Sequence, residues 1–448
     1  MREKFFKIID QLLGKQKARA LVMFLLFFLA MTIFWILKPI KKGTFISYFR
    51  VNTLDLWGTS LGGAEAEQLA KLTVVFVALL AAILLKGITK YFSFQKVFLF
   101  TTLSAAAAIT FFASGILSVQ GWLAWGLYVF GDVQNSLLIV LLWSLLHNTF
   151  KWREAKRVLG IVGLGSVAGG LCGTIFLQHT LLILGRETVI ELCGFLMLVI
   201  AVVGTTYARK CAANDRESDK MPRVEAVSSS EREDGNLLTG WRHCKSSRYW
   251  LTIALLVVLY EATSGIIDFQ LSMAVENMAG HDTGRDVYFS FVGSAQNAVA
   301  LVVQLFFSGE IIRRWGLSNA LLVLPLTILG GSVGFLFAPT LAGAMFLSVS
   351  DNGLNYSVNQ QAKETLYLPT EAHGRFRAKA FIDLFVQRFA KAGVAILNLL
   401  LITTSSLNGV RWLSLALIPL LVLWIATAQI AGRQFETLSW SSSVQPNS

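Results

Sequence analysis

Residues 20–37 read ALVMFLLFFLAMTIFWIL and are followed directly by KPIKK, residues 38–42. An almost wholly apolar run of this length predicts a membrane-spanning helix. Lys38, Lys41 and Lys42 lie three or four residues apart, so they share one face of that helix. Cations inside a span are costly unless they face a cavity or an anion. The segment therefore predicts a transporter with a negatively charged substrate.

The composition is typical of a polytopic membrane protein. Of 448 residues, 54% are hydrophobic and only 15% are charged, whereas about 25% charge is typical of soluble proteins. The net charge of +12 comes largely from alternate loops, which explains it without nucleic acid as a partner. The four cysteines form no C-x-x-C pair and the five histidines show no ligand spacing, so we expect no metal site, no cofactor and no enzyme chemistry.

Apolar segments of about 20 residues, the length that crosses a bilayer, recur along the chain. Lys and Arg gather in alternate loops, which places both termini in the cytoplasm and the protein in the lipid bilayer. We predict an all-α polytopic membrane protein with twelve transmembrane helices. They lie near 20–40, 69–86, 97–119, 123–146, 158–180, 188–208, 249–269, 286–308, 318–337, 340–359, 381–404 and 411–431.

A long polar segment divides these helices six and six. Residues 209–248 are rich in charged residues and serine, a composition typical of a disordered linker. We predict an N-terminal six-helix bundle over 1–208, a cytoplasmic linker over 209–248, a C-terminal six-helix bundle over 249–432 and a tail over 433–448 that is too polar to pack. This arrangement is typical of major-facilitator carriers, although no sequence repeat connects the two halves.

Three glycines recur every four residues in the fifth predicted helix: Gly165, Gly169 and Gly173. Small residues at this spacing let two membrane helices approach closely. A phosphate-binding loop is the alternative, but the stretch lacks the Lys-Ser/Thr ending of such loops and lies at membrane depth. We therefore predict a packing role.

Acidic residues inside predicted spans are candidates for gating or coupling, because they face a cavity or pair with a cation. Asp268 lies near the outer end of the seventh helix, with Glu261 two turns earlier on nearly the same face. We expect a lysine of the first helix as the partner of Asp268, and an interfacial carboxylate stays open as the alternative. Asp132 interrupts the fourth helix, where a structural hydrogen bond is an equally good explanation.

A charged stripe begins the eleventh helix. Lys379 and Asp383 are four residues apart, and Arg388 and Lys391 are three apart. Snorkelling to the cytoplasmic surface explains Lys379, but Arg388 and Lys391 lie too deep for it, and the planar fork of arginine suits a phosphate. Asp383 joins the candidates for gating or coupling. The predicted substrate-binding residues are Lys38, Lys41, Lys42, Lys379, Arg388 and Lys391.

Four stretches carry motifs of a known family. They are ILKPIKK (36–42), WSLLHN with EAKR (143–157), residues 260–268, and AKETLYLP continuing to KAFID (362–383). The chain resembles the bacterial and plastid ATP/ADP translocases, nucleotide transporters of the major facilitator superfamily. The resemblance implies binding of ATP, a bacterial inner membrane, and roles in transport for Lys41, Asp268 and Lys379.

Three residues depart from the family pattern. The first motif has Pro39 and Lys42 where the family has acids, and Ser272 stands where the family has a lysine.

We expect nucleotide exchange by alternating access through a basic cavity, because closing that cavity empty would desolvate like charges. Two alternatives stay open: a proton-coupled carrier of another anionic solute, and a membrane protein that interacts with partners without transport.

Overall fold

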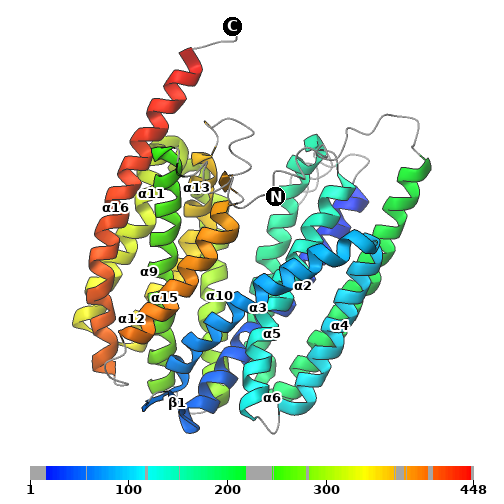
Figure 1. Ribbon diagram of the computed structural model, residues 1–448, viewed down its shortest axis with the longest axis horizontal. Helices are drawn as coiled ribbons and strands as arrows, with labels where there is room; N and C mark the ends of the chain where they lie inside the picture. Colours follow the sequence, from blue (N-terminus) through cyan, green and yellow to red (C-terminus); the bar gives the residue numbers. More distant parts are fainter. Residues whose placement is uncertain are drawn as a thin grey trace. The chain divides into compact units, whose positions relative to one another are not determined.

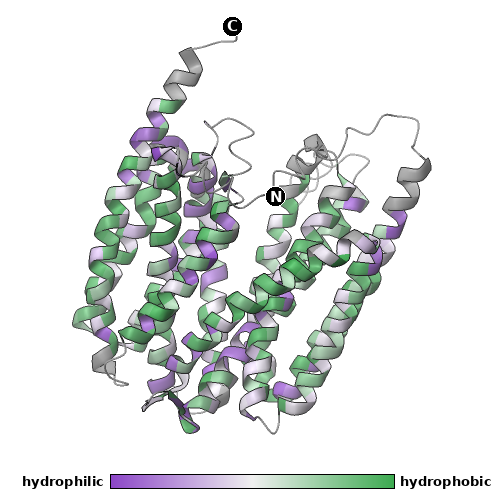
Figure 2. Ribbon diagram, in the orientation of Figure 1, coloured by the Kyte–Doolittle hydropathy of each residue, from purple (hydrophilic) through white to green (hydrophobic). Residues whose placement is uncertain are grey.

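The computed structural model describes residues 17–56, 58–116, 120–150, 152–217, 245, 247–278, 282–367, 369, 378–379, 381–401 and 407–444. Almost all of them are helical (Figure 1). Helices follow the apolar runs because backbone groups in hydrocarbon must find their hydrogen bonds within the helix. Figure 2 shows that the helices are largely apolar along their lengths.

In chain order, the elements are α2 (Lys17–Val51), β1 (Leu54–Leu56), β2 (Thr59–Leu61), α3 (Gly63–Tyr91), α4 (Phe94–Gly115), α5 (Gly121–Thr149), α6 (Trp152–Glu217), α9 (Arg248–Met278), α10 (Asp282–Phe306), α11 (Ser308–Phe337), α12 (Leu341–Leu354), η3 (Asn355–Asn359), α13 (Gln360–Leu366), η4 (Ile382–Val386), α15 (Gln387–Leu400) and α16 (Leu407–Val444). The two η elements are π-helical turns.

Within the described residues, nine helices are long and apolar enough to cross a membrane, and all nine lie on predicted spans. One of them, Gly160–Lys210, covers two predicted spans, because α6 is interrupted at Gly185, where φ is 78°. The predicted spans 340–359 and 381–404 fall on helices that η3 and η4 interrupt. The prediction of an all-α polytopic membrane protein is confirmed.

Two compact units make up the chain, and they do not coincide with the sequence halves. Unit 1 comprises Met1–Asn52, Phe76–Pro222 and Gly280–Ser294, and unit 2 comprises Thr53–Val75, Arg223–Ala279 and Ala295–Ser448. The first part of α3 therefore packs within unit 2, and the first part of α10 within unit 1. These two helices contain the second and eighth predicted spans, which occupy equivalent places in a six-plus-six arrangement.

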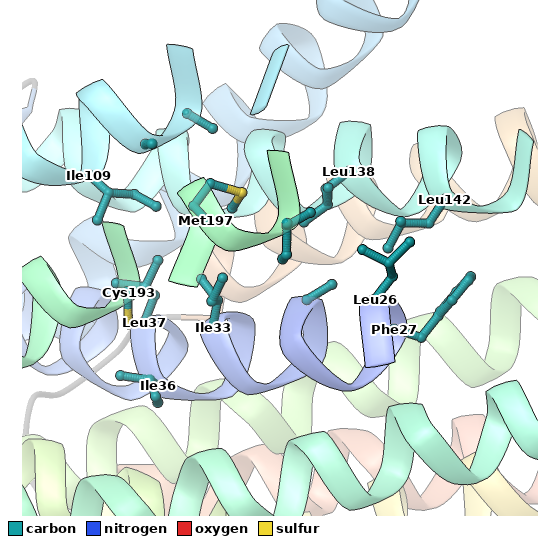
Figure 3. Close-up of a cluster of buried hydrophobic side chains, with 14 of the residues drawn as sticks. Leu26, Phe27, Ile33, Ile36, Leu37, Ile109, Leu138, Leu142, Cys193 and Met197 are labelled. Carbon is teal, nitrogen blue, oxygen red and sulfur yellow. The ribbon is translucent and has the colours of Figure 1, made fainter. Parts of the chain in front are cut away.

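The core of unit 1 is an apolar cluster that α2 shares with α4, α5 and α6. Leu26 and Ile33 of α2 are fully buried there, together with Leu142 of α5 and Met197 of α6. Figure 3 shows how these side chains meet. The run that first predicted a span thus also supplies the centre of the unit.

Close contact between α6 and α2 depends on the predicted glycines. A Cβ atom on Gly165 would lie 2.8 Å from the carbonyl oxygen of Phe24, and one on Gly173 would lie 2.6 Å from that of Thr32. A Cβ on Gly169 would meet the backbone of Phe28 still more closely. The predicted packing role is confirmed, because only glycine lets the two backbones approach this far.

Both predicted polar segments contain helix. The tail predicted not to pack is helical as far as Val444, and the hydroxyl of Ser318 on α11 donates to Glu436 on α16 at 2.9 Å. α6 likewise continues to Glu217, inside the predicted linker. The prediction of disorder for the rest of that linker falls on residues 218–244, which lie outside the described residues.

Candidate substrate site

Lys41 lies at the centre of a charged cluster in unit 1. Its side chain is 4% exposed, and its Nζ atom lies 2.5 Å from Oδ1 of Asp132 on α5. Nζ also lies 3.5 Å from the carbonyl oxygen of Tyr128 and 4.6 Å from the centre of that ring. The neighbouring Gly131 leaves room for the lysine, because a Cβ there would lie 2.9 Å from its Cδ. The structure thus joins Lys41 and Asp132, which the sequence indicated separately.

Aromatic rings hold the other two lysines of α2. The Nζ atom of Lys38 lies 4.4 Å from the centre of the Trp35 ring, and that of Lys42 lies 5.1 Å from the centre of the Phe289 ring. Lys42 is buried, with 7% of its surface exposed. The face of an aromatic ring attracts a cation without carrying a formal negative charge. Such contacts help to hold the two ammonium groups in place.

The first part of α10 adds charged groups that were not among the predicted site residues. Arg285 is buried and donates to the hydroxyl of Ser47 at 2.8 Å. Asp286 is fully buried, and its Oδ2 lies 2.6 Å from Nε of Arg186. In the sequence, Arg285 and Asp286 could have been found as adjacent opposite charges at the start of a helix. The cluster contains five cations and two carboxylates, so it is positive: Lys38, Lys41, Lys42, Arg186 and Arg285 with Asp132 and Asp286.

In unit 2, Asp268 of α9 pairs with α3. Its Oδ2 lies 2.6 Å from Nζ of Lys71, which is also 3.7 Å from Oε1 of Glu67. Within unit 2, the structure thus pairs Asp268 with a lysine of the second predicted span. The expected pairing with a lysine of the first helix stays a prediction. Ser272, one turn further along α9, donates to Glu67 at 2.7 Å.

A second carboxylate of α9 caps the start of α3. Glu276 accepts hydrogen bonds from the backbone N–H of Gly63 at 2.8 Å and of Ala64 at 2.7 Å. These amides have no partner inside their own helix, and the positive end of the helix dipole favours a carboxylate there. Asp268, Ser272 and Glu276 are spaced every four residues, so three successive turns of α9 hold the first part of α3.

The charged stripe near η4 makes its pairs with α13. Lys379 Nζ lies 2.5 Å from Glu364 Oε2 and 5.3 Å from the ring centre of Tyr367, while Asp383 lies 3.4 Å from Lys363. The sequence predicted a continuous α-helical stripe at i,i+4 spacing. The π-helical turn at Ile382–Val386 changes that spacing, because its hydrogen bonds run from i to i+5.

Glu261 connects α9 with α15. The carboxylate is 5% exposed and accepts a hydrogen bond from Nε2 of Gln387 at 2.6 Å. Its other oxygen lies 3.8 Å from Nζ of Lys391. Arg388 is half-buried on the same helix. Glu261 and Lys391, predicted separately, are thus brought together, and Gln387 is a functional candidate that charge patterns alone did not reveal.

A cavity of about 60 Å³ lies beside Glu261, within unit 2. Its apolar lining includes Leu256, Leu321 and Trp424, and its polar lining consists of Tyr260, Glu261, Asn355, Asn359, Gln360, Lys363 and Gln387. One turn along α9, the hydroxyl of Ser264 donates to the buried carboxylate of Asp351 at 2.6 Å. Asp351 was not among the predicted residues, although it is an acid inside a predicted span.

Long apolar helices define a polytopic membrane protein, and solved structures of transporters share its fold. A bacterial homologue of the iron transporter ferroportin in an inward-facing state aligns with a TM-score of 0.61 and 14% identity, covering 92% of this chain and 98% of that chain. A bacterial homologue of the human lysosomal transporter Spinster gives 0.58 and 13%, covering 95% and 99%. At these identities the likeness establishes a major-facilitator-type fold alone.

Sequence comparison identifies the family. A model of the TLC ATP/ADP transporter family matches residues 103–347 and 341–435. The chain is 23% identical over 365 residues to ADP,ATP carrier protein 1 of Chlamydia muridarum, covering 72% of this chain and 67% of the relative. It is also 23% identical over 344 residues to the plastidic ATP/ADP-transporter of Solanum tuberosum, covering 69% and 53%. The chain belongs to the TLC ATP/ADP transporter family.

Proposed function

We propose that this membrane protein exchanges ATP for ADP by alternating access. The observation that carries the proposal is the buried ammonium group of Lys41, which is 4% exposed within a positive cluster on an apolar helix. Asp132 already pairs with Lys41, but the cluster contains more cations than carboxylates, so it suits an anionic substrate. The family of the chain, and the carriers of Chlamydia and plants that it matches, indicate that the anion is a nucleotide.

The candidate carboxylates act as exchangeable partners of the candidate cations. Asp132 pairs with Lys41, and Glu261 lies beside Lys391. A phosphate that enters offers a lysine or arginine stronger charge-assisted hydrogen bonds than water does. In this proposal the carboxylate holds the cation in place when the site is empty and releases it to the substrate. Asp383 does the same for Lys363, whereas Asp268 holds Lys71 so that α3 stays packed against α9.

The same charges explain why exchange is preferred to one-way transport. An empty site must cross the occluded state with its cations desolvated, and removing charges from water costs several kcal/mol per ion. A nucleotide that is bound during both the inward and the outward transition reduces that cost. Lys38, Lys42, Lys379, Arg388 and Lys391 complete the proposed phosphate-binding set.

The orientation follows from the loops. Lys and Arg gather in alternate loops on the side of the two termini, so we place both termini in the cytoplasm. The chlamydial relatives support a bacterial inner membrane as the location. A reporter cysteine added at residue 445 should then react with a membrane-impermeant reagent only after the membrane is opened.

The experiment that tests the function is uptake of radiolabelled ATP into proteoliposomes that are either preloaded with ADP or left empty. We expect uptake in the preloaded vesicles and little in the empty ones. Uptake that needs a proton gradient and ignores internal ADP would replace exchange with the proton-coupled alternative. The matched controls are vesicles without protein and preloaded vesicles that receive excess unlabelled ATP.

A further inference from the structure

We propose that the cavity beside Glu261 binds the adenine base of the substrate, so that unit 2 recognises the base. This inference rests on the proposed function. The cavity has a volume of about 60 Å³. At roughly 10–15 Å³ of such space per water molecule, it holds about four to six waters. A flat ring system replaces a similar number of waters, whereas a complete nucleotide does not fit. The phosphates must therefore lie outside the cavity.

The lining combines apolar walls with a few amides, as ligand pockets commonly do. Trp424 lies edge to face with Tyr260, with ring centres 5.9 Å apart. Both rings line the cavity together with Leu256 and Leu321. Stacking of a base on an aromatic side chain contributes to binding whatever the base, because every base has a π-face.

Amide side chains supply the groups that distinguish adenine. Asn359 Nδ2 donates to Asn355 Oδ1 at 2.9 Å, and Gln387 Nε2 donates to Glu261. Among the described residues, these bonds leave the Asn355 Nδ2, the Asn359 Oδ1 and the Gln387 Oε1 without a partner. The remaining atoms are one donor and two acceptors. The Watson–Crick and Hoogsteen edges of adenine each pair an amino donor with a ring-nitrogen acceptor, and asparagine or glutamine is the usual reader of the latter edge.

An independent feature points to the same place. Asn355 and Asn359 are the two ends of the π-helical turn η3, and Gln387 follows directly after the second turn, η4. π-Helical turns are rare and occur frequently at functional sites. Here two of them, far apart in the sequence, bring all three amides to one cavity.

The charged residues beside the cavity suit the phosphate end of the ligand. Lys363 lines the cavity, and Lys391 lies 3.8 Å from the lining residue Glu261. A base held among the amides would therefore have cations of α13 and α15 close to its sugar and phosphates.

Binding of ATP and of inorganic tripolyphosphate to the purified full-length protein tests this inference. Tripolyphosphate carries the phosphates without the base. We expect the wild type to bind ATP at least tenfold more tightly than tripolyphosphate. Asn359→Ala and Gln387→Ala should each weaken ATP binding roughly tenfold and leave tripolyphosphate binding within about twofold of the wild-type value. Asn352→Ala, which changes an asparagine outside the cavity, is the matched control and should bind both ligands normally.

Three results would overturn the inference. The first is equal affinity of the wild type for ATP and tripolyphosphate, because the base would then contribute nothing. The second is unchanged ATP binding in both variants, and the third is an equal loss of both ligands in both variants. If the wild type bound neither ligand, the proposed function itself would fail, which distinguishes that failure from a failure of the base site alone.

Discussion

The charged residues of the two units are held in different ways. In unit 1, the lysines of α2 lie on a regular helix against aromatic rings, and Lys41 has one carboxylate, Asp132. In unit 2, cations and carboxylates alternate in pairs beside π-helical turns, and amides line the cavity between them. A positive cluster and an amide-lined cavity suit different chemical groups. The cluster of unit 1 suits phosphates, whereas the cavity of unit 2 suits the base, with cations beside it.

The largest effect is expected from disrupting the close contact between α6 and α2, the helix that carries the lysines of the unit 1 cluster. Gly169→Ala places a methyl group against the backbone of Phe28 on the helix that carries the lysines. Overpacking typically costs about 1–3 kcal/mol, and a backbone contact cannot be relieved by a rotamer change. We expect a large loss of folded protein, measured by size-exclusion chromatography and thermal unfolding. Gly163→Ala on the same helix, where a Cβ would meet nothing within 4 Å, should unfold like the wild type.

The next largest effect concerns the cation at the centre of unit 1. Lys41→Ala should abolish ATP exchange, but it also leaves the partly exposed carboxylate of Asp132 without its lysine, which lowers stability. The double variant Lys41→Ala with Asp132→Asn removes that second problem. We expect it to insert and unfold normally and still fail to exchange ATP. Lys96→Ala, which changes an exposed lysine of α4, should transport normally.

The contact between α9 and α3 should give an intermediate effect. The pair of Lys71 and Asp268 is partly exposed, at 25% and 40%, and such pairs contribute on the order of 1 kcal/mol. Asp268→Asn should therefore slow exchange roughly fivefold. Lys71→Gln combined with Asp268→Asn should slow it no further, because both variants remove the same pair. Additive losses in initial rates of uptake would contradict a shared role.

The smallest effect is expected at Glu261. Glu261→Gln keeps an oxygen that accepts from Gln387 and removes only the charge beside Lys391, which is 54% exposed. Since an exposed cation is well solvated, exchange should change by no more than about threefold. Complete loss of uptake, with normal ATP binding, would indicate that this carboxylate carries a proton and would favour the proton-coupled carrier.

Much of the fold could be predicted from the sequence because the membrane makes local composition decisive. Apolar runs located the helices, and the spacing of Gly165, Gly169 and Gly173 predicted a close helix contact that the backbone of α2 provides. The residues after Arg433 were not predicted to be helical, because the segment is polar. Ser318, which contacts it, lies far away in the sequence.

The site was harder to predict because its pairs connect distant segments. Lys41 and Asp132 were both named, but nothing in the sequence joined them. The pair of Asp268 with Lys71 was not predicted, because the inclusion of the first part of α3 in unit 2 depends on tertiary contacts such as that of Glu276. The π-helical turns left no pattern in the residues, so the amides that they place around the cavity were overlooked.

The most direct test of the central claim compares the two units on one pair of ligands. ATP and tripolyphosphate binding should be measured for Lys41→Ala with Asp132→Asn and for Asn359→Ala. The division of roles predicts that the unit 1 variant loses both ligands to the same degree, whereas the unit 2 variant loses ATP alone. Normal tripolyphosphate binding by the unit 1 variant would contradict a phosphate site at Lys41.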